Sequence, residues 1–376
     1  MKTDILIIGA GPAGSTLARS LALAGRHPLL IERATHPRHK PCGGGIPART
    51  EDLLDFSLKP VGGYPITSVG LDGAWTGRRI FPLEQNKETA SERGLLIVER
   101  SRFDALLADK AVEAGAELVQ NCGFRHATRL SGGGFLVETS DGRRIETRII
   151  AACDGVFSPT AKALGFSPNS TGFCLEGLMP IPEHISPEAR SRAVFNLAAV
   201  RGGYAWIFPR HDVLAIGIGG ACCEGRTLKK RFRSFIARTP ELRGGKLKKI
   251  FGGMIPDFSG PRPRYAENGV WLVGDAAGLV DPLTGEGIFY AIVSARHAAT
   301  SILAGDPDLY GTLLAEDILP ELGLAVRAAR RFRGKIPLLI GLALSWPSFG
   351  LRARRFVDLL LGRTTYREIY SAFRPA

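Results

Sequence analysis

The first 32 residues constrain the fold more than any other part of the chain. An apolar, β-branched run leads into a turn with glycine at Gly9, Gly11 and Gly14, and a stretch of helical character follows. Gly9 permits the tight turn, Gly11 permits the close approach of a pyrophosphate, and Gly14 permits close packing of helix on strand. A second apolar run ends at Glu32, where an acidic side chain accepts hydrogen bonds from an adenosine ribose. This order of features predicts a dinucleotide-binding βαβ unit.

Length and charge set the range of partners. The 376 residues, 45% of them hydrophobic, provide for two or three domains with substantial cores. Lys and Arg number 49 against 36 Asp and Glu, a net charge of +13. This balance favours an anionic membrane surface, a phosphorylated substrate or an acidic electron carrier, with general solubility as the alternative. We find no recognised nucleic-acid-binding motif and expect no nucleic-acid partner.

Chain start and cysteine usage indicate the compartment. The first strand begins by residue 4, which predicts no signal peptide and a cytoplasmic protein. The six cysteines show no CxxC and no zinc-like spacing, so we expect reduced thiols and no metal site. The uncharged run Ile336 to Leu351 contains two prolines and is too short to span a bilayer. Because basic residues flank it, we expect peripheral contact with the inner face of the membrane; a buried helix pair is the alternative.

The pattern along the chain predicts an α/β fold with an α+β insert. The outer parts read as a discontinuous Rossmann-type domain, the inserted parts as a β-sheet substrate domain, and the end as a helical region. The predicted boundaries are 1–60, 95–169 and 265–305 for the dinucleotide-binding domain, 61–94 and 170–264 for the substrate domain, and 306–376 for the C-terminal helical region.

Three later segments narrow the choice of dinucleotide. Gly274-Asp275 follows the apolar run Val270 to Val273, and a carboxylate at such a strand end binds polyol hydroxyls. A glycine-led helix start at 285–288 presents free N–H groups and a positive dipole end, which suit an anionic reduced isoalloxazine. The other two segments are Asp154-Gly155, with the residues up to Lys162, and Arg100 before a helix with one apolar face.

Together these segments resemble the FAD-dependent oxidoreductases of the p-hydroxybenzoate hydroxylase-like fold. The resemblance implies bound FAD, although Lys162 stands where the hydroxylases usually have Arg, which weakens transfer of their nicotinamide contact. The candidate cofactor-binding residues are Gly9, Gly11, Pro12, Ala13, Gly14, Glu32, Arg33, Cys42, Gly43, Gly44, Arg100, Asp154, Gly155, Gly274, Asp275, Gly285, Gly287 and Ile288.

Two further motifs resemble the geranylgeranyl reductase family. One is Lys40-Pro-Cys-Gly-Gly-Gly45; the other is Tyr204-Ala-Trp-Ile-Phe-Pro209, followed after seven residues by Gly217-Ile-Gly219. Members of this family saturate isoprenoid double bonds in archaeal lipids, chlorophyll side chains and quinone tails. The alternation of Tyr204, Trp206 and Phe208 places three aromatic side chains on one strand face, where they form a wall for an apolar chain or ordinary sheet core. Gly217 and Gly219 then leave space for substrate or serve strand packing.

The candidate catalytic residues are Cys42 and Tyr204. As a thiol in a loop that the family places near the flavin, Cys42 donates a proton or steers the substrate; a buried small residue is the alternative. The candidate substrate-binding residues are Tyr204, Trp206, Phe208, Gly217 and Gly219.

These features predict a FAD-dependent reductase that saturates C=C bonds of a geranylgeranyl-type chain on a lipid, quinone or pigment precursor. The alternatives are a FAD-dependent monooxygenase or halogenase acting on an apolar or aromatic substrate, and a flavin-bound carrier protein. The sequence has no second strand-GxGxxG-helix unit. We therefore expect either transiently bound NADPH or a reduced acidic ferredoxin as electron donor.

Overall fold

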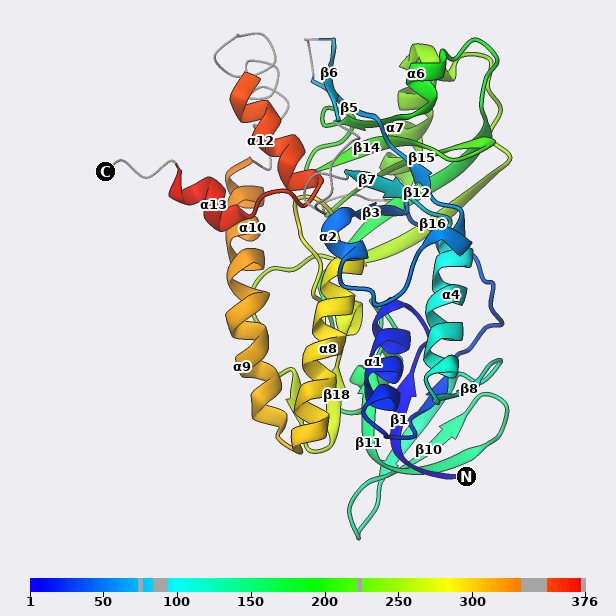
Figure 1. The fold of residues 1–376 in the computed structure, drawn as a ribbon, viewed down its shortest axis with the longest axis vertical. Coiled ribbons are helices and arrows are strands. Elements are labelled where there is room, and N and C mark those ends of the chain that lie inside the picture. The colour runs from blue at the N-terminus through cyan, green and yellow to red at the C-terminus, as the bar shows by residue number, and fades with distance from the viewer. Residues whose placement is uncertain (74–76, 84–93, 222–224, 333–349, 373–376) are drawn as a thin grey trace. The chain divides into compact units, whose positions relative to one another are not determined.

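The chain forms two compact units in the computed structural model, which describes residues 1–73, 77–83, 94–221, 225–332 and 350–372. Unit 1 consists of Met1–Lys40, Arg100–Ser170 and Pro256–Gly323, and unit 2 consists of Pro41–Glu99, Thr171–Ile255 and Leu324–Ala376. Figure 1 labels the elements of both units.

Unit 1 is built on a sheet whose central strands are parallel. Its strand order is β17-β18-β11-β1-β2-β8, and β9 and β10 extend β11 in antiparallel fashion. The strands are β1 (Lys2–Ile8), β2 (Leu29–Ile31), β8 (Glu117–Val119), β9 (Phe124–Arg129), β10 (Phe135–Thr139), β11 (Arg144–Ala152), β17 (Ala266–Glu267) and β18 (Val270–Leu272). Strands β1 and β2 are apolar and buried at their carboxyl ends, as expected of a parallel sheet covered on both faces.

Helices of unit 1 pack around the first βαβ unit. Helix α1 contacts both α4 and α8, and these three helices lie next to one another in Figure 1. The helices are α1 (Pro12–Leu23), α4 (Arg100–Glu113), α5 (Pro159–Ala163), α8 (Ile288–Ala304) and α9 (Pro307–Asp317), with the short 3₁₀ helix η3 (Gly274–Ala277). Leu17 and Leu21 of α1 are fully buried against this sheet and helix layer.

Unit 2 contains a seven-stranded sheet and a small three-stranded sheet. The larger sheet has the order β16-β12-β15-β14-β13-β5-β6, and the smaller one has the order β3-β7-β4. The strands are β3 (Gly45–Pro47), β4 (Tyr64–Pro65), β5 (Ser68–Asp72), β6 (Arg78–Pro82), β7 (Leu95–Ile97), β12 (Thr171–Pro180), β13 (Arg192–Asn196), β14 (Gly203–Pro209), β15 (Val213–Gly220) and β16 (Lys249–Pro256). The helices are α2 (Ala48–Glu51), η1 (Lys59–Val61), α6 (Pro187–Arg190), α7 (Gly225–Arg238), η2 (Pro240–Leu242), α12 (Gly350–Leu360) and α13 (Tyr366–Ser371), and α10 (Leu319–Phe332) begins in unit 1 and ends in unit 2.

The two faces of the seven-stranded sheet belong to different cores. Strand residues alternate between faces, so Ala205 and Ile207 pack with Phe232 of α7, whereas Trp206 and Phe208 pack with Val357 of α12. The sheet is therefore covered on both sides, and the aromatic residues of β14 all lie on the face away from α7.

The mixed α/β fold predicted from the sequence is confirmed, and the two compact units do not follow the predicted domain ranges throughout. Residues 41–60 lie in unit 2, because β3 pairs with β7. The C-terminal region does not form one unit: α9 belongs to unit 1, whereas Val357 packs in the core of unit 2. The segment Ile336 to Leu351 falls almost entirely outside the described residues, as do Cys222 and Cys223. No helix of the described ranges is long and apolar enough to cross a membrane.

Candidate functional site

The glycine turn of unit 1 leaves open space in front of α1. A Cβ atom at Gly9, whose φ is +102°, would lie 2.5 Å from the Cys153 carbonyl oxygen, and one at Gly14 would lie 1.9 Å from the Gly9 carbonyl oxygen. At Gly11 a Cβ would meet only Arg38 Nη2, at 3.7 Å. Helix α1 begins at Pro12 without a side-chain cap, so its first N–H groups are available to an anion. This geometry fits the pyrophosphate of a dinucleotide.

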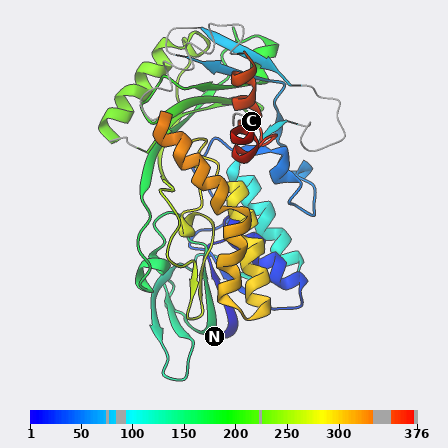
Figure 2. The ribbon, with the colours of Figure 1, turned by 90° about the vertical axis from the view of Figure 1, so that its left-hand side faces the viewer.

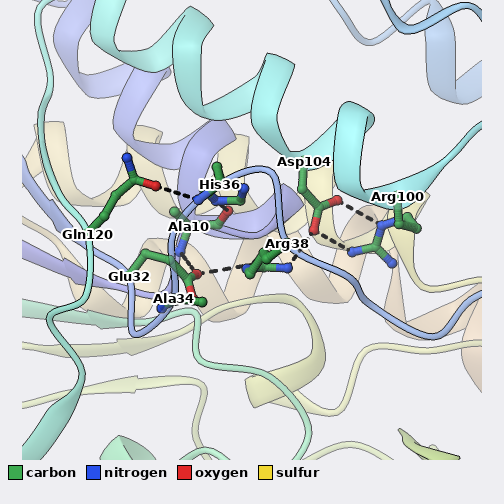
Figure 3. Close-up of polar contacts among 8 residues, drawn as sticks. All are labelled: Ala10, Glu32, Ala34, His36, Arg38, Arg100, Asp104 and Gln120. Carbon is green, nitrogen blue, oxygen red and sulfur yellow. Dashed lines mark hydrogen bonds and ion pairs between the residues drawn. The ribbon is translucent and has the colours of Figure 1, made fainter. Parts of the chain in front are cut away.

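The buried carboxylate of Glu32 lies beside this turn (Figure 3). Its Oε2 accepts a hydrogen bond from the Ala10 N–H at 3.0 Å, and its Oε1 accepts one from the Ala34 N–H at 3.1 Å. Arg38 Nη2 forms an ion pair with Oε2 at 3.3 Å. A carboxylate offers about four acceptor positions, so these three donors leave room for a ribose hydroxyl.

Arg38 links Glu32 to a second ionic group on α4. Its Nη1 donates a hydrogen bond to Asp104 Oδ2 at 3.0 Å. The same carboxylate accepts hydrogen bonds from Nε and Nη2 of Arg100 at 2.8 and 2.9 Å. Asp104 is fully buried, and two guanidinium groups balance its charge. Arg100 was expected from the sequence, but Arg38 and Asp104 were not. Arg33 is exposed and lies outside this network.

Asp154 has a local role in the structure. Its Oδ1 accepts a hydrogen bond from the Ser158 hydroxyl at 2.5 Å, and its Oδ2 accepts one from the Thr160 N–H at 3.0 Å. Ser158 in turn caps the N-terminus of α5, and Gly155 has a φ of +87° within the turn. Asp154 therefore shapes the loop between β11 and α5.

Asp275 is the acidic group of unit 1 best suited to receive a ligand hydroxyl. Its backbone carbonyl accepts the Asn169 amide, but no described residue donates a hydrogen bond to its carboxylate. Burial raises the pKa of Asp275, and the nearby charges of Lys40 and Arg100 oppose that rise. Asp275 is partly buried, so a carboxylate there without a donor is costly, and a polyol chain would provide the missing donors.

The loop before α8 is ordered by its own hydrogen bonds. Asp281 Oδ1 accepts from the backbone N–H groups of Leu283 and Thr284, and the Gly285 N–H donates to the Asp281 carbonyl oxygen. Gly287 is the N-cap of α8 and supplies no side-chain cap. The N–H groups of the first turn of α8 point out of the N-terminal end of the helix. A Cβ at Gly287 would lie 3.4 Å from Asp275 Oδ1. The helix start and the carboxylate thus belong to one site.

In unit 2 the Cys42 loop lies directly on the aromatic residues of β14. A Cβ at Gly43 would come within 2.7 Å of the Phe208 ring and 3.2 Å of Trp206 Nε1. Gly44, at a φ of +78°, accepts the Val98 N–H through its carbonyl oxygen. The Gly44 N–H points to Cys42 Sγ at 3.4 Å, which holds the thiol in place.

A buried ion pair anchors this loop to the sheet. Glu176, only 1% exposed, accepts the Cys42 N–H at 2.9 Å. Arg210 Nη2 donates to the Cys42 carbonyl oxygen at 3.1 Å and to Glu176 Oε1 at 3.3 Å. The sequence analysis predicted neither Glu176 nor Arg210 as a site residue. The available signals were an acid inside the apolar strand β12 and an arginine directly after Pro209.

The aromatic residues of β14 form a compact row. Ring centroids are 5.9 Å apart for Tyr204 and Trp206 and 6.4 Å apart for Trp206 and Phe208. Trp206 and Phe208 are only 8% and 7% exposed, and the buried indole N–H of Trp206 has no acceptor among the described residues. A Cβ at Gly217 would lie 2.0 Å from the Trp206 ring, and one at Gly219 would lie 2.8 Å from Cys174 Cβ. Neighbouring side chains therefore fill the space at both glycines.

Comparison with known proteins places the chain in a family. A family model described as FAD binding domain matches residues 2–182. A digeranylgeranylglycerophospholipid reductase from Methanopyrus kandleri is 32% identical over 318 residues, which cover 79% of this chain and 80% of that protein. The chain belongs to the geranylgeranyl reductase family. It is therefore a FAD-dependent oxidoreductase.

Solved structures share the fold of this family member. A geranylgeranyl bacteriochlorophyll reductase-like protein from Thermoplasma acidophilum superposes with a TM-score of 0.80 at 24% identity, over 92% of this chain and 91% of that one. The flavin-dependent brominase Bmp2 reaches a TM-score of 0.75 at 20% identity, over 97% of this chain and 94% of that one. At these identities the likeness concerns the fold alone.

Within each unit the structure brings together most of the residues expected for a reductase of this family. Unit 1 gathers the glycine turn with Glu32, and Asp275 with the start of α8. Unit 2 brings Gly43, the residue after Cys42, against Trp206 and Phe208. Most of the candidate cofactor-binding residues thus lie in unit 1, whereas Cys42, Gly43 and Gly44 lie in unit 2 in a loop that packs on aromatic side chains.

Proposed function

We propose that this family member reduces C=C bonds of an isoprenoid, geranylgeranyl-type chain carried by a lipid, quinone or pigment precursor. One observation carries the proposal: the loop that bears the Cys42 thiol is held by the ion pair of Glu176 and Arg210, and its next residue, Gly43, packs on the aromatic side chains of β14. Such a surface suits a long apolar chain, and the thiol is a proton source next to it. The named activity of the relative from M. kandleri supports the same substrate class.

The residues of unit 1 suit FAD as the cofactor. The turn at Gly11 and the start of α1 would hold its pyrophosphate, Glu32 its ribose and Asp275 its ribityl chain, while the start of α8 would face the pyrimidine ring. Bound and reduced, FAD supplies the hydride for one alkene carbon. NADPH or a reduced ferredoxin would supply the electrons.

The residues of unit 2 would bind the substrate and provide the proton. Tyr204, Trp206 and Phe208 would line the prenyl chain, and Cys42 or Tyr204 would donate a proton to the second alkene carbon. An isolated prenyl alkene has no carbonyl group to polarise it, so hydride and proton donors must be closely positioned. The ion pair of Glu176 and Arg210 would hold the proton donor in place within unit 2 by fixing the Cys42 loop.

A FAD-dependent halogenase or monooxygenase is the second candidate, because the brominase Bmp2 shares the fold. The two functions differ in their need for oxygen. We expect the dithionite-reduced protein, under argon, to convert a geranylgeranyl glycerophospholipid into a product heavier by one H₂ per saturated bond. Product formation only with oxygen, with an added oxygen or halogen atom, would assign the second function.

A further inference from the structure

The strongest concentration of charge in the sequence lies on helix α7 of unit 2 and the residues that follow it. Residues 225–250 contain ten Lys and Arg and a single acid, Glu241, so this short segment carries +9 of the net +13. All ten basic side chains are exposed. Within the described ranges none of them forms an ion pair, and Glu241 is itself paired with Arg78. The positive charge of this surface, which we call the α7 surface, is therefore not neutralised by the protein.

Helix α7 orders the centre of this surface. Leu228, Phe232 and Phe235 are buried against the seven-stranded sheet. On the opposite side, Arg226, Lys229, Lys230 and Arg233 follow the spacing i, i+3, i+4, i+7, which places them in one stripe facing solvent. The helix lies along the outside of the sheet (Figure 2). The stripe runs over seven residue steps of the 14-residue helix, which is about 10 Å along its axis.

We propose that the α7 surface docks the protein on an anionic phospholipid membrane. Four or more basic residues on one face of an amphipathic helix are the pattern that recognises acidic lipid headgroups. The apolar face of α7 is already used in the core of unit 2, so the helix binds by charge and does not insert. This distinguishes the α7 surface from the apolar segment at Ile336 to Leu351. The proposal rests on charge and burial alone and holds whatever the substrate is.

An acidic protein partner fits this surface less well. Protein interfaces are centred on buried aromatic or apolar anchors, whereas the other exposed positions of α7 are Gly225, Thr227 and Ala237. An electron carrier on α7 would also be separated by the whole sheet from the face with Cys42 and Trp206. Binding of the α7 surface to the charged headgroups of a membrane requires neither an apolar anchor nor one fixed orientation along the helix.

Flotation of the full-length, FAD-loaded protein with vesicles tests the proposal. We expect binding to vesicles of phosphatidylcholine with phosphatidylglycerol, no binding to phosphatidylcholine alone, and loss of binding in about 1 M salt, where charges are screened within about 3 Å. The variant R226Q/K229Q/K230Q/R233Q should bind roughly 1000-fold more weakly with unchanged FAD content, at about 1 kcal/mol per basic residue. The control K2Q/R26Q/R125Q/R148Q removes the same charge from exposed positions of unit 1 and should bind as the parent does.

Three outcomes overturn the proposal: absence of vesicle binding by the parent, equal weakening by both quadruple variants, or undiminished binding by the α7 variant. Heparin and duplex DNA are tested with the same proteins. Binding to these polyanions that the α7 substitutions abolish, with no vesicle binding, would assign the surface to a different partner and contradict membrane docking.

Discussion

At the residue scale, Gly11 gives the sharpest test of the cofactor site. A Cβ at this position would meet only Arg38 Nη2 at 3.7 Å, so the polypeptide itself tolerates a side chain there. The branched side chain of Gly11→Val would instead occupy the place of the pyrophosphate. We expect a folded protein whose released FAD falls to less than about a tenth of the parent content, because several charge-assisted hydrogen bonds are lost.

The matched control is Gly132→Val, because a Cβ at Gly132 has no neighbour within 4 Å. This variant should retain FAD. A Gly11→Val protein that is yellow and releases FAD in the parent's amount would show that the dinucleotide is bound elsewhere.

Asp275 provides a prediction about pH. Burial raises its pKa in the folded protein, so the ionised carboxylate opposes folding. The protonated carboxyl contributes stability that is fully present below the pKa of an unfolded Asp. This stability is lost as the pH rises through the pKa of Asp275 in the folded protein. Without cofactor, Asp275→Asn should therefore unfold at a higher temperature than the parent at neutral pH, with the difference shrinking in acid.

The same substitution should weaken FAD binding by about 10- to 100-fold, because hydrogen bonds to a charged acceptor are lost. Thermal unfolding of both apoproteins across pH and titration with FAD measure the two effects. A destabilised Asp275→Asn apoprotein with normal FAD affinity would place this carboxylate in a structural role.

We expect Cys42 to depend on the ion pair of Glu176 and Arg210 that holds its loop. Cys42→Ser should slow alkene reduction by about 100-fold, the usual contribution of a positioned acid, and leave flavin reduction by the donor unchanged. Glu176→Gln keeps an oxygen that accepts the Cys42 N–H, whereas Glu176→Ala removes that acceptor; both variants lose the negative charge opposite Arg210.

We therefore expect the Gln variant to keep most of the activity and the Ala variant to alkylate faster at Cys42 as its loop loosens. Iodoacetamide labelling of Cys42, followed by peptide mass spectrometry, provides a readout besides turnover. Equal labelling and turnover in both Glu176 variants and the parent would mean that the ion pair does not position the thiol.

At the scale of the element, strand β14 supports the aromatic row that we assign to the prenyl chain. Trp206 lies over Gly217, so Gly217→Ala would force the indole away from β15. Overpacking of this kind costs about 1–3 kcal/mol. We expect Gly217→Ala to lower the turnover of a long prenyl substrate while the FAD content stays near the parent value.

Ala215 lies on the same face of β15 and is already buried, so Ala215→Gly serves as the matched control. It changes one methyl group on that face without displacing Trp206 and should disturb substrate turnover less. Loss of FAD from the Gly217→Ala protein would indicate that the row supports the fold as a whole instead of the substrate.

Elements also show which parts of the site the sequence could predict. The glycine turn and Glu32 are consecutive in the chain, and their spacing alone predicted one βαβ unit that the structure contains. Glu176 lies 134 residues from Cys42, and Arg38 lies 66 residues from Asp104. No local pattern links such partners, because their proximity depends on strand and helix packing. The role of Gly217 was left open for the same reason, since Trp206 fills its space from the neighbouring strand.

At the scale of the whole molecule, the pattern of strands and helices along the chain predicted the mixed α/β class, and the order of motifs predicted the flavin-dependent family. The extent of each unit was harder to predict. The Cys42 loop directly follows the dinucleotide unit in sequence, yet β3 joins the sheet of β7 in unit 2. Strand pairing, which depends on distant segments, set that boundary.

Flavin held by this protein should reduce prenyl double bonds without oxygen, and a single turnover under argon tests this. FAD on the protein is photoreduced, and a geranylgeranyl substrate is added while flavin absorbance is followed. We predict that oxidised FAD returns and that mass spectrometry finds one H₂ added per FAD oxidised. Flavin that stays reduced until oxygen is admitted, with an unsaturated substrate recovered intact, would contradict the account.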